Sequence, residues 1–177
     1  MNPVALVFLI IGASILGLCV LLDILIGFSM WHLSMILRKK TKNLMIILAQ
    51  KYDLCVFLAK QMIDMGVEIP EPLKAELNIS TNPAMGFKNT TERFLVARQI
   101  KRIYMDLKMI YDASESACND PKCQTIVGSI QETDALRGKE VVSFNNFGMA
   151  YNYWIMFPIF RPLSKMFHIY KVKLLEN

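Results

Sequence analysis

The chain of 177 residues begins with an apolar stretch, Pro3 to Leu37, in which Asp23 is the only ionised side chain. A helix that crosses a bilayer needs about 20 apolar residues, because each residue rises about 1.5 Å through a hydrocarbon core of about 30 Å. Residues 3–22 meet this requirement without a charge. We therefore predict a transmembrane anchor at residues 1–23, which leaves room for one modest domain after it.

Asp23 determines where the predicted span ends. A carboxylate at the centre of a bilayer costs roughly 2.5 to 3.5 kcal/mol on insertion scales, so we place Asp23 at the membrane edge. A functional buried carboxylate remains the alternative, although the apolar stretch supplies no Lys or Arg to pair with it. A cleavable signal peptide is another interpretation of an apolar N-terminus, but it would carry a basic first region and a shorter apolar core.

Basic residues are distributed unevenly about the predicted span. None precedes it, whereas four lie within residues 38–42. By the positive-inside rule, this asymmetry predicts a single-pass membrane protein with its N-terminus outside and its C-terminal domain in the cytoplasm. Two glycosylation patterns, at Asn78 and Asn89, would be unused in that compartment.

Apolar residues recur at helical spacing after the span. One stripe, with steps mostly of four, three or seven, consists of Leu44, Leu48, Cys55, Leu58, Met62 and Met65. A second stripe, with steps of four and three, consists of Val96, Ile100, Ile103, Leu107 and Ile110. Each places its members on one face of a helix, which is typical of helices that pack against each other.

These patterns predict an all-α fold, in which a single N-terminal transmembrane helix continues into an antiparallel bundle of three long helices plus short helices. The bundle domain spans residues 24–177. Its expected parts are a first helix at 24–65, a connection with a short helix at 66–90, a second helix at 91–113, a third helix at 121–157 and a short tail helix at 163–174. The basic, aromatic tail helix has two open placements, on the membrane surface or packed back on the bundle.

Few side chains suit catalysis. A nucleophilic Ser or Cys needs a base beside it, and the two histidines, His32 and His168, fall in the membrane-proximal stretch and in the tail. The sequence also contains no glycine-rich phosphate motif. We therefore predict a protein that is not an enzyme, with no cofactor and no small-molecule substrate.

The cysteines and the net charge argue against a metal ion and against nucleic acid as partners. Cys118 and Cys123 lack the paired short spacings and histidines of a zinc site, so no metal is expected, and a disulfide between them stays open for an oxidising compartment. The net charge of +5 is spread along helix faces instead of clustering with aromatic residues, which argues against nucleic acid. The expected partners are the lipid bilayer and an unidentified protein, or a second copy in self-association.

Aromatic residues recur along the last long helix. Phe144-Asn145, Tyr151-Asn152 and Phe157-Pro158 stand seven and then six residues apart. Together with Lys51-Tyr52-Asp53-Leu54 in the first helix, this series resembles the LemA family, whose members carry one N-terminal span before a helical domain. The structural or interaction residues that the resemblance implies are Tyr52, Asp53, Leu54, Phe144, Asn145, Tyr151, Asn152, Phe157 and Pro158.

The seven-residue step returns Phe144 and Tyr151 to one side of a helix, with Asn145 and Asn152 beside them. We expect the two amides to cap or cross-link neighbouring helices where they are buried. Residues 32–36 depart from the family, because neutral or apolar side chains replace the arginines that LemA-like proteins carry there. This segment is therefore expected to lie against the bilayer or under another chain.

The function expected from these features is that of a non-enzymatic, membrane-anchored helical bundle that presents a surface for protein interaction or assembly. The resemblance to the LemA family implies this general role but no specific biochemical function, because a shared fold does not determine a function. The alternative is a membrane-remodelling or pore-forming oligomer, which the apolar excess of residues 24–37 and the basic tail would suit.

Overall fold

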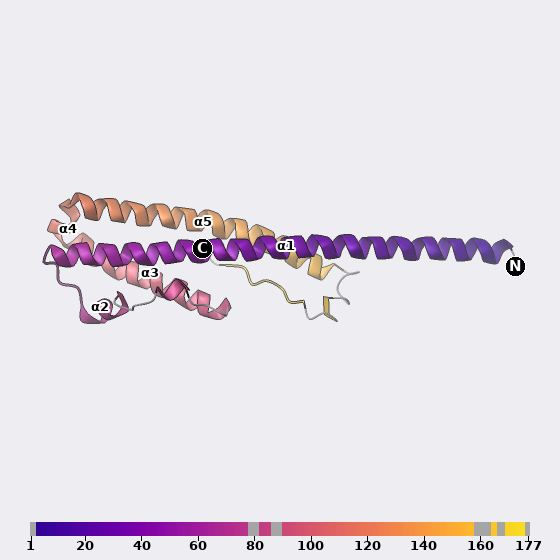
Figure 1. The fold of residues 1–177 in the computed structure, drawn as a ribbon, viewed down its shortest axis with the longest axis horizontal. Helices are drawn as coiled ribbons and strands as arrows, with labels where there is room; N and C mark the ends of the chain where they lie inside the picture. Colours follow the sequence, from indigo (N-terminus) through magenta and orange to yellow (C-terminus); the bar gives the residue numbers. More distant parts are fainter. Residues whose placement is uncertain (1–2, 78–81, 86–89, 158–163, 166–168, 176–177) are drawn as a thin grey trace. The chain divides into compact units, whose positions relative to one another are not determined.

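The computed structural model describes residues 3–77, 82–85, 90–157, 164–165 and 169–175. Every regular element within these ranges is a helix, which confirms the predicted all-α class. The elements are α1 (Pro3–Asp64), α2 (Glu71–Leu77), the 3-10 helix η1 (Pro83–Met85), α3 (Thr90–Ala113), α4 (Glu115–Asn119) and α5 (Pro121–Met156) (Figure 1).

α1 is a single helix of 62 residues, so no break separates the predicted anchor from the first bundle helix. Its N-terminal part is apolar and exposed: between Val4 and Leu25, the large hydrophobic side chains at its surface have exposed fractions of 40% to 71%. Within the described ranges, α1 is the one helix long and apolar enough to cross a membrane. Contiguous exposed apolar surface of this kind marks a lipid or protein contact.

The chain divides into two compact units, and each is described by itself. Unit 1 combines residues 1–40 with residues 143–176, and unit 2 comprises residues 41–142. Both α1 and α5 extend through the two units: α1 passes from unit 1 to unit 2 after Lys40, and α5 passes from unit 2 to unit 1 after Val142.

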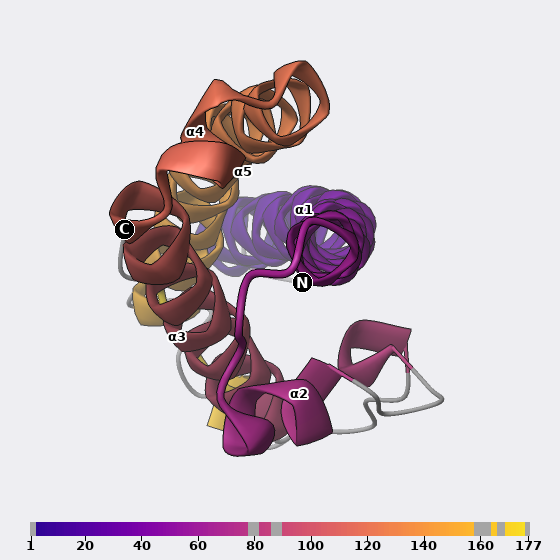
Figure 2. The ribbon, with the colours of Figure 1, turned by 90° about the vertical axis from the view of Figure 1, so that its left-hand side faces the viewer.

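Unit 2 has a core to which α1, α2, α3 and α5 all contribute (Figure 2). Both predicted apolar stripes lie in this unit, and most of their members are buried. The largest fully buried side chains are Leu58, Met62, Ile100, Ile103, Leu107, Ile130, Cys55 and Cys123. Burying a side chain of this size contributes about 1.5 to 3 kcal/mol, so packing accounts for both stripes without a cofactor.

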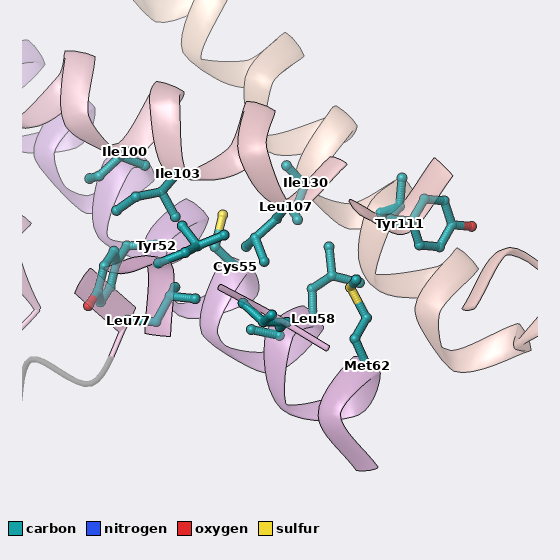
Figure 3. Close-up of a cluster of buried hydrophobic side chains, with 14 of the residues drawn as sticks. Tyr52, Cys55, Leu58, Met62, Leu77, Ile100, Ile103, Leu107, Tyr111 and Ile130 are labelled. Carbon is teal, nitrogen blue, oxygen red and sulfur yellow. The ribbon is translucent and has the colours of Figure 1, made fainter. Parts of the chain in front are cut away.

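The helices of unit 2 differ in direction. α5 runs antiparallel to α1, as Asn43 contacts Glu140 while Lys51, further along α1, contacts Asp134. α3 runs parallel to α1, because Ile100 lies near Tyr52 and Tyr111 lies towards Met62 (Figure 3). The expected antiparallel arrangement therefore holds for α5 but not between α1 and α3.

The segment that joins α1 to α3 explains this direction. Its apolar side chains Ile69, Leu73, Leu77 and Ala84 are buried in the core of unit 2. The connection thus folds back along the bundle as a packed layer, so that α3 runs in the same direction as the part of α1 from Tyr52 to Met62. A short loop at the end of α1 would have produced an antiparallel pair instead.

Gly66 ends α1. It has a φ of 79°, a left-handed conformation that glycine adopts without the steric penalty of a side chain. The N–H of Val67 donates to the carbonyl of Met62 at 3.0 Å, and the N–H of Gly66 donates to the carbonyl of Ile63 at 2.9 Å. These two bonds form a Schellman motif, which satisfies carbonyls that the helix end would leave unpaired.

Two capped turns connect α3 to α5. The side chain of Ser114 accepts a hydrogen bond from the N–H of Ala117, which starts the short helix α4. The carboxylate of Asp120 accepts from the N–H of Cys123 at 2.9 Å, and Pro121 occupies the first position of α5. Cys118 and Cys123 are both free thiols, so the disulfide left open by the sequence is not formed.

Unit 1 has a smaller core. Ile26 and Met30 of α1 are buried with Ile155 of α5. Half-buried side chains packed against them are Tyr151, Trp154, Phe157 and Ile169. The later members of the aromatic series, Tyr151 and Phe157, thus pack within this unit.

The prediction of a tail helix over 163–174 is wrong for most of the tail residues that the structure describes. Ser164 and Lys165 are helical, but residues 169–175 have no regular secondary structure. The physical reason is that side chains of α5 bind the main chain of this segment, so its N–H and C=O groups are not left to pair within a helix. The tail packs back instead of forming an amphipathic surface helix.

Candidate interaction site

Four consecutive residues of α1, Lys51 to Leu54, connect α1 to its neighbours within unit 2. Tyr52 is buried, and its hydroxyl donates to the carbonyl of Glu76 in α2 at 3.0 Å. Burial raises the pKa of the Tyr52 phenol, with a smaller contribution from the nearby carboxylate of Asp53. Leu54 is half-buried and packs against the core. The segment therefore holds the returning connection in place.

Asp53 faces the second half of that connection. Its carboxylate accepts a hydrogen bond from the side-chain amide of Asn82 at 2.9 Å, and the same amide donates to the carbonyl of Ala49 at 3.0 Å. The Oδ1 atom of Asn82 then accepts from the N–H of Ala84, which starts η1. The predicted residues Tyr52, Asp53 and Leu54 thus have structural partners.

Lys51 forms a charge pair that the sequence analysis did not single out. Its ammonium lies 2.7 Å and 2.6 Å from the two carboxylate oxygens of Asp134 in α5. The same Nζ lies 4.5 Å from the ring centroid of Tyr104 in α3, a cation–π distance. Lys51 therefore joins α1, α3 and α5 through one buried cation.

A shallow groove with a volume of about 470 Å³ lies beside this pair. Lys101 and Arg137 add positive charge to its lining, and Val141 adds apolar surface. The thiol of Cys55 lies within the electrostatic influence of Lys51 and Asp134. Burial raises its pKa to about 12, so the thiol stays protonated at neutral pH and is a poor nucleophile. Within the described parts of the chain, no three His, Cys, Asp or Glu residues gather as a metal site would require.

The other predicted site residues, Phe144, Asn145, Tyr151, Asn152 and Phe157, form what we call the α5 motif. They lie in unit 1. Phe144 is buried, whereas Tyr151 and Phe157 are half-buried against the Ile26 cluster. Burial raises the pKa of the Tyr151 phenol, and the nearby guanidinium of Arg38 lowers it by a smaller amount. Pro158 lies outside the described residues.

Asn145 and Asn152 bind the C-terminal tail, not a neighbouring helix. The side-chain amide of Asn152 donates to the carbonyl of Val172 at 2.8 Å and accepts from the N–H of Val172 at 2.8 Å. Asn145 makes the same pair of bonds to the carbonyl and N–H of Leu175, each at 2.8 Å. The expected cross-link is therefore made to an extended segment of main chain.

The spacings of the two partners agree. The asparagines are seven residues apart on α5, a rise of about 10.5 Å at about 1.5 Å per residue. Val172 and Leu175 are three residues apart, a rise of about 9.3 Å in an extended helix of the polyproline II kind. The seven-residue step of the motif thus matches one turn of such a segment.

Gly148 lies between the asparagines on the same face, three residues after Asn145 and four before Asn152. A Cβ atom at this position would lie 2.9 Å from the Cδ2 atom of Leu174 and 3.8 Å from the Cγ1 atom of Val172. The glycine therefore allows the tail to lie close to the helix. We define Asn145, Gly148 and Asn152 as the asparagine site.

The predicted site residues fall into two groups in different units. Tyr52, Asp53 and Leu54 belong to unit 2, and the α5 residues belong to unit 1. Sequence reasoning missed Lys51–Asp134 as a pair and the tail as the ligand of the asparagines. Comparison of the chain with family models, with characterised proteins and with solved structures found no match, so the resemblance to the LemA family stays a prediction.

Proposed function

We propose that this chain is a non-enzymatic, LemA-like membrane protein whose helical domain binds polypeptide partners in the cytoplasm. The observation that carries the proposal is the exposed apolar N-terminal part of α1, which joins a helical domain with its own buried core. An apolar helix of that length is stable in a bilayer and costly to expose to water. The basic residues that follow it support a cytoplasmic domain.

Protein binding is favoured over chemistry by the character of the polar groups. The buried cation Lys51 is bonded to a carboxylate, and the asparagines are bonded to main chain. Such groups fix positions and recognise backbone, as interaction surfaces do. We therefore assign the α5 motif to polypeptide recognition.

Proximity labelling in the native host tests this proposal, with the labelling enzyme fused after residue 177. We expect the labelled set to contain cytoplasmic or cytoplasm-facing membrane proteins, and a matched fusion without residues 1–22 should lose the membrane members. Labelling of exported proteins by the full-length fusion would contradict the proposed orientation.

A second candidate function is that of a membrane-remodelling or pore-forming oligomer. It is favoured by an exposed apolar stripe beyond Asp23, formed by Ile24, Phe28, Trp31 and Met35, because these side chains extend the apolar surface past a single span. Dye-loaded liposomes test it: release on addition of the purified protein supports a pore. Intact liposomes of unchanged shape would eliminate this candidate.

A further inference from the structure

The asparagine site binds backbone N–H and C=O groups. All four of its hydrogen bonds go to the backbone N–H and C=O groups of Val172 and Leu175, so their formation does not depend on the side chains at those positions. Each asparagine satisfies both polar groups of one residue, as a neighbouring strand would do in a sheet. The ligand class of the site is therefore an extended polypeptide.

The site also selects a backbone conformation. In a flat β-strand, residues three apart face opposite edges, so a single helix could not pair with both of them. With three residues per turn, a polyproline II-like segment presents residues three apart to the same side. Leu174 then reaches the surface of Gly148, which adds a preference for a tail with an aliphatic side chain at that position.

We propose that the asparagine site is an assembly site, in which the tail of a second copy of this chain, residues 169–175, replaces the chain's own tail. The inference rests on the proposed membrane anchoring and names the partner that the proposed function leaves open. Exchange of an identical segment preserves every bond, so it forms an assembly without new complementarity.

The second copy is the partner that the structure supports best. Its tail has the same N–H groups and the same aliphatic residues that already contact the site within one chain. Because α1 up to Lys40 and the asparagine site belong to the same unit, two copies anchored alike hold sites and tails at corresponding heights. Anchoring in one membrane also raises the local concentration of tails.

An exposed stripe on α1 independently favours the meeting of two copies. Ile24, Phe28, Trp31 and Met35 are spaced by four, three and four residues, and each is at least half exposed. This spacing is that of a seam between two parallel helices. Two copies inserted in the same direction would bring their stripes together next to the tails.

Two full-length variants separate the site from the tail. In the tail variant, Val172→Pro and Leu175→Pro remove the two N–H donors, while the φ of proline remains compatible with an extended backbone. In the site variant, Asn145→Ala and Asn152→Ala remove the amides. Each carries one half of the interaction, so only a mixture can form the exchanged contact.

The measurement is energy transfer between donor-labelled and acceptor-labelled protein in liposomes. We expect transfer between the tail variant and the site variant to exceed transfer within either variant alone, with an apparent affinity at least about tenfold higher, from the loss of hydrogen bonds at buried polar groups. Association through the α1 stripe is common to all samples and sets the baseline. Lys171→Pro is the matched control, and adding it to the site variant should leave transfer unchanged.

Competing peptides identify what is recognised. A peptide of residues 169–177 should abolish the excess transfer, and the same peptide with N-methyl groups at Val172 and Leu175 should not. Adding Gly148→Leu to the tail variant should also abolish it, because the side chain occupies the place of Leu174. Equal potency of the two peptides would overturn backbone recognition.

The remaining outcomes are equally decisive. A mixture with no more transfer than its components overturns the second copy as partner, even where the peptide of residues 169–177 binds the tail variant. Binding of the peptide can also be measured in detergent, without a membrane. A failure of membrane anchoring can therefore be distinguished from a failure of the asparagine site. Circular dichroism of each variant verifies that the helices are intact.

Discussion

At the scale of single residues, Lys51 contacts both α3 and α5 from α1, through Tyr104 and Asp134. Its side chain has an exposed fraction of 6%, whereas that of Asp134 has one of 38%. Removing the carboxylate therefore leaves a charge in the core, while removing the ammonium leaves a charge that water can reach. The pair should respond asymmetrically to substitution.

We predict that Asp134→Asn lowers the free energy of unfolding by about 3 kcal/mol, the low end for a broken buried pair, because water partly reaches the site. Lys51→Met keeps most of the side-chain volume and should cost about 1 kcal/mol, in the usual range for substitutions. Urea unfolding followed by circular dichroism of the full-length protein in detergent measures both. Equal losses for the two variants would contradict the assigned burial.

Asp120 gives a prediction about pH. The hydrogen bond from the backbone N–H of Cys123 lowers the pKa of Asp120 below its ordinary value of 3.8. A lowered pKa stabilises the folded state above the unfolded pKa, and this stabilisation is lost as the pH falls through the folded pKa. The advantage of the native protein over Asp120→Ala should therefore shrink as the pH falls below about 4.

Asp120→Asn is the control, because an amide caps the helix without titrating. Its advantage over Asp120→Ala should stay constant across the same pH range. Thermal unfolding monitored by circular dichroism at pH 7 and below pH 4 compares the three proteins. A constant difference between the native protein and Asp120→Ala would refute the role of the charge.

At the scale of elements, Gly66 determines where α1 stops and the connection turns back. Gly66→Ala should destabilise the protein by about 1 kcal/mol, since a left-handed conformation costs an L-residue roughly 1–2 kcal/mol. Gly66→Asn should cost less, because asparagine tolerates this conformation better. Nothing lies within 4 Å of the added Cβ, so strain alone produces the effect. Unfolding midpoints of the two variants give the comparison.

The helices were predictable from sequence because their signals are local. The apolar stripes of α1 and α3 and the stop at Gly66 each depend on neighbours a few residues away. The direction of α3 was not predictable in the same way, because it depends on long-range bonds such as that between Tyr52 and the carbonyl of Glu76. The tail was missed for the same reason: its apolar and basic residues fit a helix until Asn145 and Asn152 bind its main chain.

The candidate site shows the same limit. The seven-residue step identified both asparagines as members of one face, and this reading is confirmed by their common ligand. Their ligand itself could not be predicted, since an amide gives no sign of whether it will bond to a helix, a ligand or main chain. The exposed stripe on α1 remains consistent with both expected coverings, the bilayer and another chain.

At the scale of the whole molecule, the proposed function requires that residues 3–22 cross a membrane and that the helical domain lies in water on the cytoplasmic side. The apolar side chains from Val4 to Leu25 are exposed, and lipid is the environment in which that exposure is favourable. In the proposed assembly, tail exchange at the asparagine site would take place between copies anchored in the same membrane.

Protease protection in sealed vesicles of known orientation tests this claim most directly. In inside-out vesicles, trypsin should remove the helical domain of the full-length protein and leave the N-terminal apolar fragment in the membrane, where it resists alkaline extraction. In right-side-out vesicles, the whole chain should be protected until detergent is added. Release of the intact chain by alkaline extraction would contradict the membrane anchor, and digestion of the domain in right-side-out vesicles would contradict its cytoplasmic placement.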